Sequence, residues 1–435
     1  MPYPLRNGML QNEALRTRRT DGEAVAPSTF TWLDTSEHDR RRALDVIDLF
    51  KQRDTRDELG IGPVRDALAD LLTPGTSTIQ TRARYLFFIP WTYLDLERLR
   101  ASSADVARRA RERELALIDV LAESADHGGT IGIEARRKLK RLPSAVYWGG
   151  LGTFGIRLFP GAQDQYHRGL DRFYREQERA SASRQDREGE RRDRQNWHPH
   201  LPAPPSDHPT GASFALRREE AEYLQDRILQ RAPGSLLAFL MDRGRLADPV
   251  DFPWEHPLVG ELPSRLSNLL EHARCFSEAM HGAALLYNRM LAELLARDEW
   301  TTEYQEWIQK WVALVGERAA RLAGWDRSEF WKIVRSRGAV VPSSTQAFIE
   351  SWISLALGMR DAGDVISSRD ARNLIEHRER YLKRGRARLV NREQLELWGG
   401  AAGTAPLDYR WGTTQTIVTD ILRGVAGEGS GARAA

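Results

Sequence analysis

The chain has 435 residues, and 64 Lys and Arg against 61 Asp and Glu give it a formal net charge of only +3 at pH 7. This length is enough for two or three domains. Hydrophobic residues make up 41% and charged residues 29% of the chain, a balance typical of soluble globular proteins. No stretch approaches the roughly 20 apolar residues of a membrane-spanning helix, and the N-terminus lacks the apolar core of a secretory signal. The single cysteine, Cys275, excludes an internal disulfide and fits a reducing compartment. We therefore expect a cytoplasmic protein with no membrane partner.

The first ordered element is expected after residue 29. Residues 1–29 are polar and without apolar periodicity, which predicts disorder. Residues 30–50 then predict a helix that Thr35 or Ser36 can cap, and 30–175 as a whole predict a helical domain.

Two short helices joined by a tight turn are predicted over 60–91. Pro63 suits the first helical turn, and apolar residues follow it at helical spacing up to Leu72. Thr73-Pro74-Gly75 breaks that helix. Thr76 or Ser77 can cap a second helix, which Pro90 is expected to end.

The second predicted helix carries six polar side chains outside its apolar stripe. They are Ser77, Thr78, Gln80, Thr81, Arg82 and Arg84. Hydroxyl, amide and guanidinium groups suit contacts to phosphates and base edges, so the pattern is typical of a helix-turn-helix. An ordinary helical hairpin with a solvated face explains the same pattern and is a common unit.

A second unit of the same kind is predicted over 130–161. A basic helix, 136–141, precedes a fresh helix start at Pro143-Ser144, which parallels the first unit and allows a winged variant. Tyr147 and Trp148 in that helix could stack on bases, although burial in a core is the more frequent fate of such aromatics.

Residues 176–211 are predicted to be a linker, because their mixed charges and prolines leave few aliphatic side chains to bury. A second helical domain is expected over 212–424, followed by a disordered tail, 425–435. The longest predicted helix of this second domain starts at Ser264 and carries a broad apolar face.

That long helix contains Glu278-x-x-His281, a form found in di-iron bundles. We favour core histidines instead, because His272, Cys275, Glu278 and His281 cannot share one helical face at steps of three. We therefore predict no metal ligands.

The densest basic cluster falls within 369–396. KRGRAR contains no acid, and we predict that Lys383, Arg384, Arg386 and Arg388 contact phosphate. Glycine-rich nucleotide loops and the common hydrolase and metalloprotease motifs are not found, so no catalytic residues and no cofactors are expected.

Several segments also carry a family likeness. FTWLDTSEHDRRRALDVIDLF, AVYWGGLGTFGIR, EAMHGAALLYNRML and LVNREQLELWGGAAG resemble an uncharacterised bacterial family of unknown function. The resemblance implies a setting in anti-phage defence islands, near helicases and phospholipase D-like proteins, and it carries over no catalytic residues.

Together these observations predict a mainly α fold, with N-terminal helix-turn-helix-like units and a C-terminal helical bundle. The leading hypothesis is a non-catalytic nucleic-acid-binding subunit of a defence complex, with duplex DNA as its partner. Two alternatives stay open. One is a scaffold that holds a helicase or nuclease through the Trp-rich helices of 300–352. The other is a metal-dependent nuclease whose site is assembled from distant residues.

Overall fold

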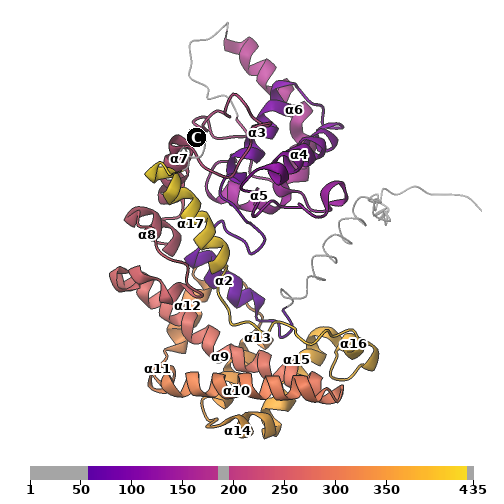
Figure 1. The fold of residues 1–435 in the computed structure, drawn as a ribbon, viewed down its shortest axis with the longest axis vertical. Helices are drawn as coiled ribbons and strands as arrows, with labels where there is room; N and C mark the ends of the chain where they lie inside the picture. The colour runs from indigo at the N-terminus through magenta and orange to yellow at the C-terminus, as the bar shows by residue number, and fades with distance from the viewer. Residues whose placement is uncertain (1–56, 185–194, 429–435) are drawn as a thin grey trace, which may run out of the picture. The chain divides into compact units, whose positions relative to one another are not determined.

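Helices account for nearly all regular structure in the computed structural model, which describes residues 57–184 and 195–428 (Figure 1). Within these ranges the only β-type pairing is an isolated bridge between Arg157 and Trp197. The predicted mainly α fold is confirmed. The predicted disorder over 1–29 and the helix expected over 30–50 lie outside the described residues.

The first half of the chain forms five α-helices in its described part. They are α2 (Gly62–Leu72), α3 (Tyr85–Arg98), α4 (Val106–Glu123), α5 (Pro143–Thr153) and α6 (Gln163–Arg184), with a 3-10 turn η1 (Arg136–Lys138) before α5. Helix α2 and the fresh start of α5 agree with the sequence-based predictions. The basic helix expected over 136–141 is reduced to the single turn η1.

Helix α3 differs from the prediction at both ends. It begins at Tyr85 rather than near residue 76, and it continues through Pro90, which was expected to end it. A proline inside a helix costs about 3 kcal/mol. Every residue from 85 to 93 is buried, and burying a large apolar side chain contributes about 1.5 to 3 kcal/mol. Burial of this run therefore outweighs the penalty at Pro90.

Residues 76–84 form an irregular segment, so the helix predicted there is wrong. Three of its backbone N–H groups are satisfied by side chains from distant parts of the chain. The Tyr147 hydroxyl accepts from the N–H groups of Thr81 and Arg82 at 2.8 and 3.0 Å, and Asp420 accepts from Ala83 N–H at 2.9 Å. Since these donors already have partners, the segment does not need helical hydrogen bonds.

The region expected to be a linker, 176–211, is largely structured. Helix α6 continues through its first part to Arg184, and residues 195–211 pack onto the N-terminal helices. Trp197 is buried, and its Nε1 donates to Glu97 of α3 at 3.1 Å. Trp197 therefore anchors the segment in the core, although the segment has few aliphatic residues.

The second half begins with two helices, α7 (Arg218–Arg231) and α8 (Leu236–Arg243), and is built around a long helix, α9 (Ser264–Leu294). The remaining elements are η2 (Pro253–Glu255), η3 (Pro257–Glu261), α10 (Asp298–Glu317), α11 (Ala319–Ala323), α12 (Arg327–Arg335), α13 (Ser343–Ala356), α14 (Ala362–Ser367), α15 (Arg369–Lys383), η4 (Arg384–Arg386), α16 (Arg392–Glu396) and α17 (Trp411–Ala426).

Helix α9 confirms the longest predicted helix, and α10, α13 and α15 pack against it. Gly282 of α9 lets α10 approach closely, because a Cβ built there would lie 2.3 Å from the Trp311 ring. The Trp311 Nε1 donates to the Glu278 carbonyl of α9 at 2.7 Å. The tryptophan thus bridges the two helices.

The last helix, α17, packs against α7 and α8 (Figure 1). Its Asp420 also reaches the 76–84 segment, where it accepts from Arg82 Nε at 3.0 Å. All described residues belong to one compact unit, and contacts of this kind run across the boundary expected at 176–211. Among residues 57–184 and 195–428, no helix combines the length and the apolar character that a membrane crossing requires.

Candidate functional site

The six polar residues predicted to face nucleic acid do not share one outward surface. Of them only Thr78 is exposed, while Gln80 and Arg84 are 4% and 5% exposed. Arg84 Nη2 lies 3.0 Å from the fully buried carboxylate of Glu220 and forms an ion pair with it. Arg84 therefore holds α7 in place and cannot meet a phosphate.

Arg82, Thr81 and Ser77 are half-buried, and the first two are occupied by contacts within the protein. Arg82 forms ion pairs with Asp420 at 3.0 Å and Asp126 at 2.9 Å, and Thr81 Oγ1 donates to the Gly129 carbonyl at 2.6 Å. The expected recognition helix is missing over 76–84, and its two arginines are bordered by acids.

The predicted basic cluster, 383–388, is divided between the interior and the surface. Lys383 and Arg388 turn inward and form ion pairs with Glu58, and Lys383 also pairs with Glu379 at 2.9 Å. Burial alone would raise the pKa of Glu379. The charge of Lys383 and the hydrogen bonds that Glu379 accepts outweigh this effect, so the pKa of Glu379 lies below its ordinary value. Glu379 accepts from Tyr287 Oη at 2.6 Å, which ties the cluster to α9.

Arg384 and Arg386 are exposed and form no ion pair with any residue in the described ranges. With Arg380, Tyr381, Leu382 and Lys383 they line an open surface cavity of about 710 Å³, and none of these described lining residues is acidic. Tyr381 is 66% exposed there. We call these six residues the basic surface.

The backbone at Arg384 adopts φ +52° and ψ −126°. This conformation is that of the first central residue of a type II′ turn, where glycine is preferred because a Cβ is strained. Two hydrogen bonds fix the backbone that follows: Ala387 N–H donates to the Arg384 carbonyl at 3.1 Å, and Asn391 Nδ2 donates to the Gly385 carbonyl at 2.7 Å. An arginine is thus kept exposed at a position that suits glycine better.

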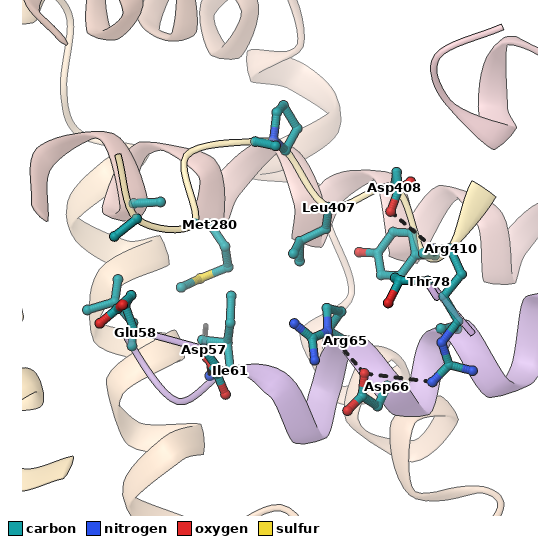
Figure 2. A pocket seen from close by; sticks show the side chains of 18 of the residues that line it. Asp57, Glu58, Ile61, Arg65, Asp66, Thr78, Met280, Leu407, Asp408 and Arg410 are labelled. Carbon is teal, nitrogen blue, oxygen red and sulfur yellow. Dashed lines mark hydrogen bonds and ion pairs between the residues drawn. The ribbon is translucent and has the colours of Figure 1, made fainter. Parts of the chain in front are cut away.

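A second candidate is a cavity of about 650 Å³ between α2, α9 and the segment 402–410 (Figure 2). In Figure 2, Glu58, Asp57, Ile61 and Met280 lie at one end of it and Thr78, Asp408 and Arg410 at the other. We call it the main cavity.

The segment 402–410 is held over α9 by hydrogen bonds along its length. Asn288 Oδ1 accepts from Ala402 N–H at 2.9 Å, His281 Nε2 contacts the Thr404 carbonyl at 2.9 Å, and Tyr409 Oη donates to the Ala273 carbonyl at 2.6 Å. In the sequence, Gly403 and Pro406 of this segment belong to no nucleotide-loop motif. Their role as a cavity wall follows from partners more than a hundred residues away.

Most charged groups of the main cavity already have partners. Arg65 pairs with Asp66 at 3.0 Å, and Arg410 pairs with Asp70 at 2.6 Å. Asp57 accepts from the N–H groups that open α2.

The residues of the metal-like pattern on α9 are likewise occupied. Glu278 pairs with Arg274 and Arg318 at 2.7 and 2.9 Å, and His272 Nδ1 accepts from Trp325 Nε1 at 2.8 Å. In the described part of the chain, no group of three or more His, Cys, Asp or Glu side chains has metal-binding geometry.

The tryptophans of 300–352, which the scaffold hypothesis assigns to a partner-binding surface, are buried or half-buried. Trp311, Trp331 and Trp352 are buried, and Trp352 Nε1 donates to the Ala279 carbonyl of α9 at 2.8 Å. Trp300, Trp307 and Trp325 are half-buried and also pack against the core.

No curated protein and no solved structure matches the chain. A family model described as a family of unknown function, DUF6361, matches residues 27–423, which include the 76–84 segment, the main cavity and the basic surface. The chain therefore belongs to the DUF6361 family.

Proposed function

We propose that the protein binds nucleic acid without acting on it, through phosphate contacts made by Arg380, Arg384 and Arg386. The observation that carries this proposal is the basic surface, where two exposed guanidinium groups have no acidic partner among residues 57–184 and 195–428 and none of the described lining side chains is acidic. Guanidinium groups bind phosphate oxygens in a bidentate manner.

The proposed binding is largely independent of sequence. Phosphate contacts position a protein on nucleic acid without reading its bases, and the 76–84 segment offers no helix to enter a major groove. We keep duplex DNA as the expected partner. Tyr381, which is 66% exposed beside these arginines, gives single strands a further contact, because an exposed ring can stack on unpaired bases.

The strained backbone at Arg384 supports a functional role for that side chain. Strained positions of this kind cost about 1 to 3 kcal/mol and cluster at binding sites. Glycine would relieve the strain, so the presence of arginine is better explained by a contact of its side chain than by stability.

The test measures binding of labelled duplex DNA, single-stranded DNA and duplex RNA by fluorescence anisotropy across a salt series. In Arg384→Gly/Arg386→Gln, two phosphate contacts are lost. Each contact contributes about 0.9 to the slope of log K against log salt for duplex DNA, so the slope should fall by about 1.8. The control, Arg265→Gln/Arg423→Gln, removes two exposed arginines that likewise form no ion pair with described residues.

Equal binding by the two double variants at every salt concentration would remove the basic surface from the proposal. Metal-stimulated cleavage of any of the three probes by the pure protein would replace binding with the nuclease hypothesis. The family likeness supports a setting beside a helicase or a phospholipase D-like protein in an anti-phage defence complex, and we include that setting in the proposal.

A further inference from the structure

The main cavity has the size and lining of a small-molecule site. Its volume of about 650 Å³ falls within the roughly 300 to 1,000 Å³ of typical ligand pockets. Met280 from α9, Ile61 just before α2 and Leu407 from the opposite wall give it an apolar interior (Figure 2), to which Ala284 of α9 adds. Such walls favour a ligand with an apolar body over a hydrated inorganic ion.

Arg141 stands out among the charged groups that line this cavity. It forms no hydrogen bond or ion pair within the described chain, and its Nη1 is buried without a partner. Burial lowers the pKa of Arg141, and no acid is near enough to offset this effect. By contrast Arg65 and Arg410, which line the same cavity, both pair with aspartates of α2.

A second donor without a partner belongs to the same lining. Ser77 lines the cavity, and its Oγ is buried with no hydrogen-bond partner. A buried polar group that makes no hydrogen bond costs about 1 to 3 kcal/mol, so two such groups at one cavity indicate that something supplies acceptors there.

The backbone of the cavity wall is also strained. Tyr409 and Arg410 adopt φ +55° and φ +66°, both in the left-handed region that non-glycine residues rarely enter. The hydrogen bond from Tyr409 Oη to Ala273 and the ion pair of Arg410 with Asp70 hold the wall in this conformation. The cavity is therefore a built feature of the fold and not a gap in loose packing.

We propose that the main cavity binds a small organic anion, with its carboxylate, sulfonate or phosphate group at Arg141 and Ser77 and its apolar body against Met280, Ala284 and Leu407. This proposal is independent of nucleic-acid binding at the basic surface. An organic anion supplies the missing acceptors and neutralises the one cavity-lining arginine, among the described residues, that lacks an acidic partner.

The test uses 8-anilinonaphthalene-1-sulfonate, whose sulfonate and apolar rings match this chemistry and whose fluorescence rises on binding. The wild-type protein should bind the dye saturably. Arg141→Met should weaken binding by about tenfold or more, the effect of losing a charge-assisted hydrogen bond. Arg137→Met, which removes a nearby exposed arginine of η1, should bind as the wild type does.

Two further measurements separate binding from structure. Without ligand, Arg141→Met should melt no lower than the wild type, because the arginine has no partner to lose. Ala284→Phe should fill the cavity and abolish dye binding, and inorganic phosphate at the same concentration should not displace the dye. Equal affinities of the Arg141 and Arg137 variants would overturn the proposal, as would a clearly lower melting temperature of Arg141→Met. Displacement by phosphate would overturn the assignment of an apolar body.

Discussion

Arg384→Gly tests whether the arginine at position 384 lowers the stability of the fold while it strengthens DNA binding. Relief of the strained backbone, at φ +52° and ψ −126°, is worth about 1 to 3 kcal/mol. Glycine also increases the conformational freedom of the unfolded chain, which lowers stability by about 0.5 to 1 kcal/mol. The variant should therefore be more stable than the wild type by about 0.5 to 2 kcal/mol in urea denaturation, while it binds duplex DNA more weakly.

The matched control is Arg386→Gly, which makes the same substitution two residues away. Arg386 has no positive φ, so glycine relieves nothing there and should destabilise the protein by about 0.5 to 1 kcal/mol. Both variants remove one exposed cation and should weaken DNA binding to a similar degree. If Arg384→Gly is destabilised as much as Arg386→Gly, the strain argument is refuted. If both variants bind DNA as the wild type does, the assignment of the surface fails.

Three further variants test the interior. Glu114→Gln should stabilise the protein by about 3 kcal/mol at pH 8 and have little effect at pH 4. Burial raises the pKa of this carboxyl from 4.5 to about 7, so the wild type loses stability as the pH rises between those values. Denaturation curves of the variant that shift equally at pH 4 and pH 8 would contradict this pH dependence. Arg84→Ala should cost about 1.5 to 3 kcal/mol, because the buried Glu220 loses one charge-assisted hydrogen bond while it keeps its ion pair with Arg217, and a loss below about 1 kcal/mol in urea denaturation would exclude that role. Gly282→Ala should cost about 1 to 3 kcal/mol by pushing the Trp311 ring away, and unchanged near-ultraviolet circular dichroism and stability would argue against the close contact.

Local sequence patterns predicted the elements whose stability is local. The apolar spacing after Pro63 located α2, and the long apolar stripe after Ser264 located α9, around which the second half is built. In each case the deciding interactions join residues within a few positions of one another.

The irregular 76–84 segment could not be predicted in this way. Its polar residues match a capped helix, but Tyr147 and Asp420 provide partners for its N–H groups from 65 or more residues away. Likewise, the composition of 383–388 shows a basic cluster, yet only the fold shows that Glu58 takes Lys383 and Arg388 inward. The sequence shows which residues are charged, whereas the tertiary structure determines which of these charges form ion pairs.

The link between Asp420 and Arg82 spans 338 positions of the chain. A ribosome releases a protein from its N-terminus, so the guanidinium of Arg82 emerges long before its carboxylate partner is translated. Until then water must hydrate this arginine, and the apolar side of α7 lacks the cover of α17. We therefore expect the early part of the nascent chain to stay incompletely folded, and open to chaperones and proteases, until synthesis has passed α17.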